Sequence, residues 1–422
     1  MAYPIRTLPV LQNWDCQATG TCCKEYRVTL SDDEVERIRE QGWTRDDLGG
    51  LEPTRQFGPP WRRQVQLNHH ADGSCVFLSP EGRCRIHERF GYETKPLPCR
   101  LFPFVLVPAG DHWRVGMRYA CPSAAANRGR ALPEHGPDLR QFADGLARRE
   151  KLDPQPDGSL TPPPRQDRGG RLDWPDTLRL VDALVRLIRN GKDPVERRVR
   201  KCLYLADQMR QAKLDTIQGA RLGELLDLLT SAADSETPAA PTQLPPPGWI
   251  GRILFRQAAA LFTRKDHGPN RGLASRGRIA LMKAALRFTR GAGSVPRLHA
   301  ALPETTFEEL ETPRGPLPAA AEAVLERYYT VKVGSIQFCG PASFGLPFWE
   351  GFEALAVTLP LVLWVARMVR DVAPAEAVTR ALVVVDDHVG FNRVLASTRQ
   401  RLSFQILART GQLSRLIAWY SR

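Results

Sequence analysis

The sequence predicts an α+β protein in which a small cysteine-rich, metal-binding head is followed by a large, mainly α-helical body. Seven of the nine cysteines in this 422-residue chain lie within the first 121 residues, among short runs that alternate between polar and apolar residues. Such runs, separated by turn residues, are typical of short strands. Farther along, apolar residues recur at helical spacing, for example at Leu178, Val181, Leu184, Val185 and Ile188.

The head is predicted to combine strands with at least one capped helix. Ser31, with Glu34 three residues later, forms a capping-box pattern, so a helix is expected to begin there and to end at Gly42. Short strands are expected at Glu25–Leu30, Arg63–Asn68, Cys75–Leu78, Phe102–Val107 and Trp113–Tyr119.

Composition also divides the chain. Stretches rich in proline and glycine are typical of linkers. We expect a cysteine-cluster metal-binding domain at residues 1–150, a Pro/Gly-rich linker at 151–171, a helical segment at 172–232, a Pro-rich linker at 233–248 and a helical C-terminal domain at 249–422.

The ends and the apolar segments predict a cytoplasmic protein. The first residues, MAYPIRTLPVLQNWDCQ, contain one arginine and no apolar run of signal-peptide length. The most apolar stretch, Ala354–Ala366, has 13 residues, whereas a membrane span needs about 20. We therefore expect a buried core helix there and no membrane span.

The chain is basic, with a formal net charge of +13. Ten lysines and arginines but one acid, Asp266, lie between Arg252 and Arg290. The simpler interpretation is a solvated basic helix face. The alternative is a surface for an acidic protein, a nucleic acid or an anionic ligand.

The cysteines are the most informative feature. Thiolates are soft, charged donors that bind zinc and iron well. Disulfides are disfavoured by the odd number in the cluster and by the expected reducing compartment, and seven free buried thiols in so short a segment would be unusual. The predicted metal ligands are Cys16, Cys22, Cys23, Cys75, Cys84, Cys99 and Cys121.

Seven thiolates exceed what one tetrahedral site can hold. They could form one four-cysteine centre and a second site of three cysteines with His87, and His69 and His70 are further candidate donors. The spacing is neither that of a standard zinc finger nor that of a ferredoxin. The metal, zinc or an iron–sulfur cluster, therefore stays open.

These motifs resemble the YkgJ family of cysteine-cluster proteins, which are described as zinc- or iron-chelating domains. The resemblance is carried by Cys16…Cys22-Cys23-Lys24, Cys75-Val-Phe-Leu78, Cys84-Arg-Ile86 and Pro98-Cys99-Arg100-Leu-Phe-Pro103. The run Cys22–Thr29 and the element Ala120-Cys121-Pro122 are most similar to the flagellin lysine N-methylase (FliB) branch. Beyond residue 125 the similarity is weaker, with Tyr328-Tyr329…Lys332 and Glu350-Gly351-Phe352.

The resemblance implies methylation of lysine residues, with S-adenosylmethionine as the methyl donor and flagellin as a candidate protein substrate. No glycine-rich loop joins a strand to a helix, so an ordinary Rossmann cofactor site is not predicted. One hypothesis is that a metal with an open coordination position binds the cofactor's amino and carboxylate groups. Asp386-Asp387-His388, Glu350 and Glu353 could contribute to a site, although polar helix ends are the favoured explanation for them.

Three functions therefore remain. The first is a protein lysine N-methyltransferase, the second a non-catalytic metal-chelating module that binds a partner, and the third, less favoured, a nucleic-acid binder that uses the basic helices. The long helical body favours the first. The sequence assigns no catalytic or cofactor-binding residue and no oligomeric state.

Overall fold

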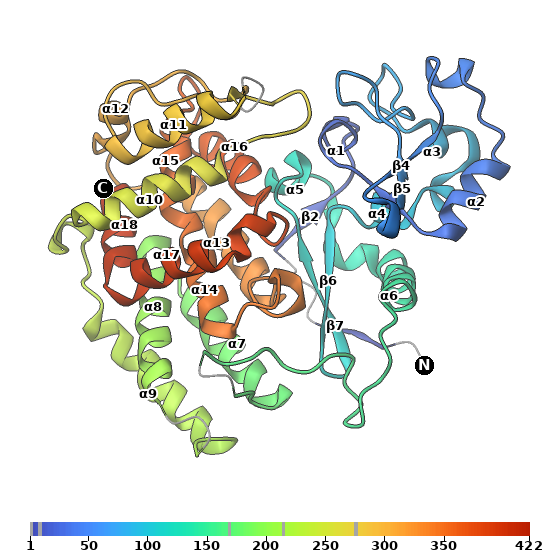
Figure 1. Ribbon diagram of the computed structural model, residues 1–422. Coiled ribbons are helices and arrows are strands. Elements are labelled where there is room, and N and C mark those ends of the chain that lie inside the picture. The colour runs from blue at the N-terminus through green and yellow to red at the C-terminus, as the bar shows by residue number, and fades with distance from the viewer. Residues whose placement is uncertain (1–2, 7–10, 168–169, 213–215, 274–276) are drawn as a thin grey trace.

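The architecture joins a small mixed head to a larger helical body (Figure 1). The computed structural model describes residues 3–6, 11–167, 170–212, 216–273 and 277–422. It is 53% helical and 10% strand, which confirms the predicted fold class.

The head contains three small sheets. The longest strands, β6 (Phe104–Ala109) and β7 (His112–Met117), form an antiparallel hairpin that pairs Phe104 with Met117, and β1 (Ile5–Arg6) lies parallel to β7. The hairpin connects Ala109 to His112 through Gly110, whose φ of 69° suits a tight turn. The other two sheets pair β3 (Thr29–Leu30) and β4 (Thr54–Phe57) with β5 (Gln64–Leu67), and β2 (Asn13–Trp14) with β8 (Arg130–Ala131).

Short helices connect these strands. They are α1 (Thr21–Glu25), α2 (Asp32–Glu40), α3 (Arg85–Phe90), α4 (Leu97–Leu101), α5 (Pro122–Ala125) and the longer α6 (Gly136–Glu150). The capping box that starts α2 is confirmed, because the Glu34 carboxylate accepts the backbone N–H of Ser31 at 2.9 Å. The same carboxylate accepts the N–H of Leu97 and pairs with Arg149, so it joins α2 to α4 and α6.

Two strand predictions in the head are wrong. Glu25 ends helix α1, and strand pairing in the predicted Glu25–Leu30 run is limited to Thr29 and Leu30. Cys75–Leu78 is a turn, in which the N–H of Leu78 bonds to the carbonyl of Cys75 at 2.9 Å. One segment follows directly after Cys22 and Cys23 and the other begins at Cys75, and the backbone there bends around a cavity instead of extending along a sheet.

The body is helical from Trp174 onward. Its helices are α7 (Trp174–Ile188), α8 (Val195–Gln211), α9 (Ala220–Glu236), α10 (Trp249–Phe262), α11 (Arg278–Arg290), α12 (Phe307–Glu311), α13 (Ala319–Gly334), α14 (Phe348–Ala356), α15 (Thr358–Ala366), α16 (Pro374–Asp386), α17 (Thr398–Arg409) and α18 (Gln412–Tyr420).

The apolar stretch is longer than expected from the sequence. Helices α14 and α15 run almost continuously over Phe348–Ala366, which is long and apolar enough to cross a membrane by length and composition. However, 94% of its most apolar window is buried inside the protein, as in a core helix.

Hydrophobic packing separates the cysteine-bearing part of the head from everything else. One large core includes the β6–β7 hairpin, α6 and the body helices. A second, much smaller core has eight buried residues, namely Leu30, Ile38, Leu48, Leu67, Cys75, Val76, Phe77 and Ile86. We call the part of the chain built on this second core the cysteine lobe (residues 21–101). The domain limits expected from composition stay a prediction.

A buried ion pair joins the hairpin to the body. The Lys332 ammonium on α13 lies 2.7 Å from Asp386 at the end of α16, and both side chains are almost completely buried. The Asp386 carboxylate also accepts the backbone N–H of Tyr119, just after β7, at 2.6 Å. Because burying a charge is costly unless it is paired, both groups are needed to hold this junction together.

We predict that Lys332→Met lowers the free energy of unfolding by about 3–5 kcal/mol, because it leaves the Asp386 carboxylate buried and unpaired. Urea denaturation followed by circular dichroism measures this change. Arg380→Met is the matched control, since its pair with Glu376 is exposed to solvent and is worth about 0–1 kcal/mol. Equal losses in the two variants would contradict this account of the junction.

Candidate metal centre

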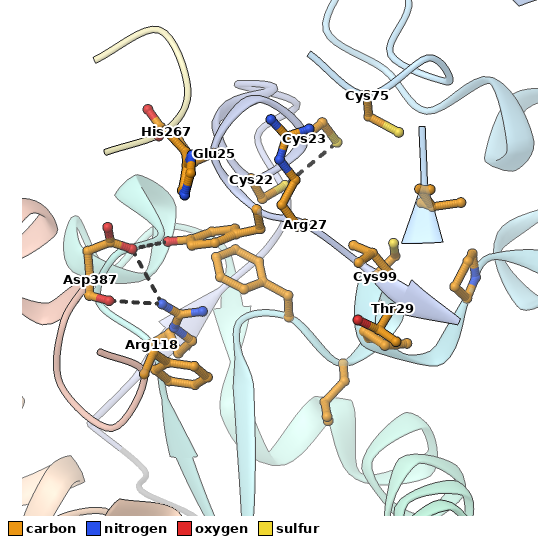
Figure 2. Close-up of a pocket in the computed structure, with 18 of the residues that line it drawn as sticks. Cys22, Cys23, Glu25, Arg27, Thr29, Cys75, Cys99, Arg118, His267 and Asp387 are labelled. Carbon is orange, nitrogen blue, oxygen red and sulfur yellow. Dashed lines mark hydrogen bonds and ion pairs between the residues drawn. The ribbon is translucent and has the colours of Figure 1, made fainter. Parts of the chain in front are cut away.

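A cavity of about 730 Å³ lies between the cysteine lobe and the body. Its walls come from the lobe, from the β6–β7 hairpin, from the segment after α10 and from the segment after α16. Figure 2 shows Cys75 and Cys99 on one side of the cavity and Arg118 and Asp387 on the other, with Cys22 and Cys23 between them near Glu25. The first side, together with Cys22 and Cys23, is rich in sulfur, and the second is rich in charge. We call these the cysteine end and the polar end.

Five of the seven predicted metal ligands line this cavity, and they come from four separate parts of the chain. They are Cys22, Cys23, Cys75, Cys84 and Cys99. The Cys22 and Cys23 sulfurs lie 3.9 Å apart. Zinc–sulfur bonds of about 2.3 Å in a tetrahedral site place two sulfurs about 3.8 Å apart, so this pair already has the spacing of two ligands to one ion.

Backbone contacts bring the cysteine segments together. The N–H of Cys75 donates to the carbonyl of Cys23 at 2.8 Å, which joins the Cys75 turn to α1. Gly82, with φ of +81°, lies so close to the loop before α1 that a Cβ there would come within 2.5 Å of the Ala18 carbonyl oxygen. The loop that ends at Cys84 therefore packs directly on the loop that leads to Cys22.

The environment of these thiols disfavours bare thiolates. Burial raises the pKa of Cys75 to about 12 and raises the pKa of Cys99 well above its ordinary value. The hydrogen bond with Cys23, followed by burial, also raises the pKa of Cys22. A metal cation removes this penalty, since it deprotonates the thiols that it binds. The donor set therefore suits a soft cation.

Of the other predicted donors, His69 lines the cavity, whereas Cys16, Cys121 and His87 do not. Cys16 is exposed and Cys121 is buried at the start of α5, and neither lines the cavity. His87 is exposed on α3. Both ring nitrogens of His69 lie within hydrogen-bonding distance of backbone carbonyls, at 3.0 and 3.2 Å. In the part of the chain that the structure describes, no three His, Cys, Asp or Glu side chains are already grouped closely enough to hold a metal ion.

All nine cysteines fall within the described residues, and none forms a disulfide. The two cysteines outside the head, Cys202 and Cys339, are completely buried in the large core. They behave as small apolar residues. The cavity cysteines differ from them because they surround open space.

The polar end is a connected group of charged and aromatic side chains. Asp387, the residue after α16, accepts from the Tyr26 hydroxyl at 2.8 Å and pairs with Lys265 at 2.6 Å. Lys265 also pairs with Glu25 at 3.0 Å, and the Arg118 guanidinium lies 3.4 Å from Asp387. Although burial opposes ionisation, Lys265 and Arg118 outweigh it and lower the pKa of Asp387. The four charged side chains therefore form one connected group.

The polar clusters seen in the sequence divide between two places. Asp387 and His388 line the cavity, whereas Asp386 turns to Lys332 and to the Tyr328 hydroxyl, which lies 3.2 Å away. Glu350 is remote from the cavity lining and pairs with Arg401 at 2.5 Å. The structure therefore does not bring these motifs together in one site.

Sequence reasoning missed Arg118, Glu25 and Lys265. Arg118 and Glu25 are each a few residues from a predicted cysteine ligand, and that proximity was the available clue. Lys265 was counted only as part of a basic surface.

We predict that Gly82→Ala destabilises the cysteine lobe and lowers its metal content, because the new Cβ would collide with the Ala18 carbonyl and separate the two cysteine-bearing loops. Gly91→Ala is the matched control, since Gly91 has a similar φ of +92° but no atom within 4 Å of an added Cβ. Thermal unfolding and metal analysis of both variants measure the effect. Indistinguishable variants would show that the close approach at Gly82 does not matter.

Comparison with known proteins agrees with the chemistry of the cysteine end. Residues 15–122 match the model of a family described as a "putative zinc- or iron-chelating domain", and all seven predicted ligands fall within the match. The searches of curated proteins and of solved structures found no match.

The matched family is named after the pattern Cys-x2-Cys-x2-Cys-Cys. This chain places Cys16, Cys22 and Cys23 at that spacing, with Thr19 in the second position. A threonine hydroxyl is a poor ligand for a soft cation, so the pattern loses one donor here. The match covers less than half of the chain and gives no support to the narrower flagellin N-methylase branch. Residues 15–122 thus match a zinc- or iron-chelating domain, and five of the seven cysteines within that match line one cavity.

Proposed function

We propose that the chain binds a zinc or iron centre at the cysteine end of the cavity. The observation that carries this proposal is that Cys22, Cys23, Cys75, Cys84 and Cys99 come from separate segments and line one cavity. A tetrahedral cation would take four of these five thiolates, with side-chain rotation in the cavity adjusting their positions. Cys16 and Cys121 stay predicted ligands, and their sulfurs would have to move farther.

The stability of the lobe supports the same proposal. Eight buried residues form a very small core, and small folds with little buried area usually need a disulfide or a metal to hold them together. No disulfide is present. Structural zinc supplies about 10–16 kcal/mol of apparent binding free energy in small peptides, which is enough to fill this role.

We predict that Cys22→Ser, Cys75→Ser and Cys99→Ser each reduce the bound metal sharply. Loss of an outer-shell partner alone lowers metal affinity about 10–100-fold, so loss of a thiolate ligand should exceed that. The measurement is elemental analysis of anaerobically purified protein, with a visible spectrum to separate an iron–sulfur cluster from colourless zinc.

Cys202→Ser and Cys339→Ser are the matched controls, because these cysteines are buried far from the cavity lining. Their metal content should equal that of the unaltered protein. Equal metal content in all five variants would contradict the proposal, and Cys16→Ser and Cys121→Ser would show whether the ligand set extends beyond the cavity.

As a second candidate function, we propose S-adenosylmethionine-dependent methylation of protein lysines, with flagellin as the substrate. The observation that favours it over a non-catalytic chelating module is the cavity itself. Its volume of about 730 Å³ lies within the range of about 300–1,000 Å³ that is usual for sites of small organic ligands. A structural metal alone needs no such space.

The reaction is a direct displacement. The lone pair of a neutral lysine amine forms the N–C bond as the S–C bond of the sulfonium breaks, the electron pair stays on sulfur, and the amine proton passes to solvent. Positioning of the two reactants supplies much of the rate enhancement in such a step. Burial raises the pKa of Tyr26 well above its ordinary value, so Tyr26 is a hydrogen-bond donor at the polar end and not a base.

We predict that the anaerobically purified chain transfers labelled methyl groups from S-adenosylmethionine to flagellin lysines, and that Asp387→Asn, which disrupts the polar end, lowers the rate at least tenfold. Arg380→Met, at an exposed pair on α16, is the control. If metal-loaded protein transfers no methyl group to flagellin or to any protein of a cell lysate, a non-catalytic chelating module is favoured. Steeply salt-dependent retention on DNA would favour nucleic-acid binding instead.

A further inference from the structure

The polar end of the cavity contains a charge pattern that is not needed to bind a metal. Arg118 and Lys265 supply two positive charges, and Glu25 and Asp387 supply two negative charges. Figure 2 shows Glu25, Arg118 and Asp387 together on the side of the cavity opposite Cys75 and Cys99. A neutral group of two cations and two anions is complementary to a ligand that carries one charge of each sign.

The Arg118 guanidinium can donate a further hydrogen bond to a ligand. Its side chain is 8% exposed, and its contacts with the Asp387 carbonyl and carboxylate are long, at 3.3 and 3.4 Å. Its Nε is buried without a hydrogen-bond partner among the residues that the structure describes. An unsatisfied buried donor costs free energy. A guanidinium also matches the planar fork of a carboxylate, so a ligand carboxylate would satisfy it.

The Glu25 carboxylate can accept further hydrogen bonds from a ligand. One of its oxygens accepts from Asn270 at 2.8 Å, and the other faces Lys265 at 3.0 Å. An ionised carboxylate has about four acceptor positions, so two remain. The Lys265 ammonium already lies between Glu25 and Asp387, at 3.0 and 2.6 Å, so a second ammonium would bind at the remaining acceptor positions of Glu25.

Aromatic rings complete this end. The Arg118 guanidinium lies 3.5 Å from the centre of the Phe391 ring and 4.5 Å from that of Tyr26, and all three side chains line the cavity. The rings hold the guanidinium in one orientation by cation–π contact.

We propose that the polar end binds the zwitterionic α-amino-acid head of a small molecule, with the carboxylate on Arg118 and the ammonium on the remaining acceptor positions of Glu25. This inference rests on the second candidate function, because S-adenosylmethionine carries such a head. It replaces the sequence-based hypothesis that an open metal position holds those two groups. The remainder of the ligand extends through the cavity toward the cysteine end.

The test compares two probes on the full-length, metal-loaded chain by isothermal titration calorimetry. S-Adenosylhomocysteine carries the amino-acid head, and 5′-methylthioadenosine is the same thionucleoside without it. Arg118→Gln is expected to lower the affinity for S-adenosylhomocysteine at least tenfold and the affinity for 5′-methylthioadenosine less than twofold. Glu25→Gln, which keeps the amide donor of Asn270 satisfied, provides a second variant if Arg118→Gln fails to fold, with the same selectivity expected.

Arg264→Gln is the matched control, because Arg264 also lines the cavity but pairs with the exposed Asp266 outside the cluster, and both probes should bind it as before. If S-adenosylhomocysteine binds the unaltered chain and both cluster variants equally well, this inference is overturned and methyl transfer survives. If neither S-adenosylhomocysteine nor free L-methionine binds the unaltered chain, the inference and methyl transfer both fail. The proposed metal centre is then still tested separately, by the metal content of the cysteine variants.

Discussion

The cysteine lobe depends on one electrostatic constraint, namely that buried thiols facing one another are costly as bare anions. Burial pushes the pKa values of Cys75 and Cys99 upward, so without a cation they are neutral and add little to a core of eight residues. With a cation, the same sulfurs become charged ligands, and binding free energy contributes directly to folding. The stability of the lobe and its affinity for metal are therefore linked, so a change that weakens one also weakens the other.

The body is joined to this lobe through charged groups at the cavity. The segments after α10 and α16 close the cavity opposite the cysteines, and Lys265 and Asp387 on these segments contact Glu25 and Tyr26 on or beside α1. Helix α1 carries Cys22 and Cys23. Helix α1, which holds two candidate metal ligands, is thus joined to the body by charged groups only a few residues away. A shift of these ligands on metal binding would therefore move the side chains of the polar end.

Much of the fold followed from local sequence patterns. The Ser31/Glu34 capping box, the two strands β6 and β7 and the helical body were predicted because short-range spacing determines them. The errors at Glu25 and Cys75 have one physical cause, which is that these segments curve around a cavity formed by distant residues. Cysteine composition predicted seven metal ligands, and five of these residues line the cavity. Its polar half was missed, because Arg118 meets Asp387, and Glu25 meets Lys265, only through tertiary packing.

The central claim, that sulfurs from separate segments converge on one ion, is tested most directly by X-ray absorption spectroscopy of anaerobically purified protein at the iron and zinc edges. The account predicts a first coordination shell dominated by sulfur at about 2.3 Å. A folded protein that contains neither metal, or a metal surrounded only by nitrogen and oxygen, would contradict it.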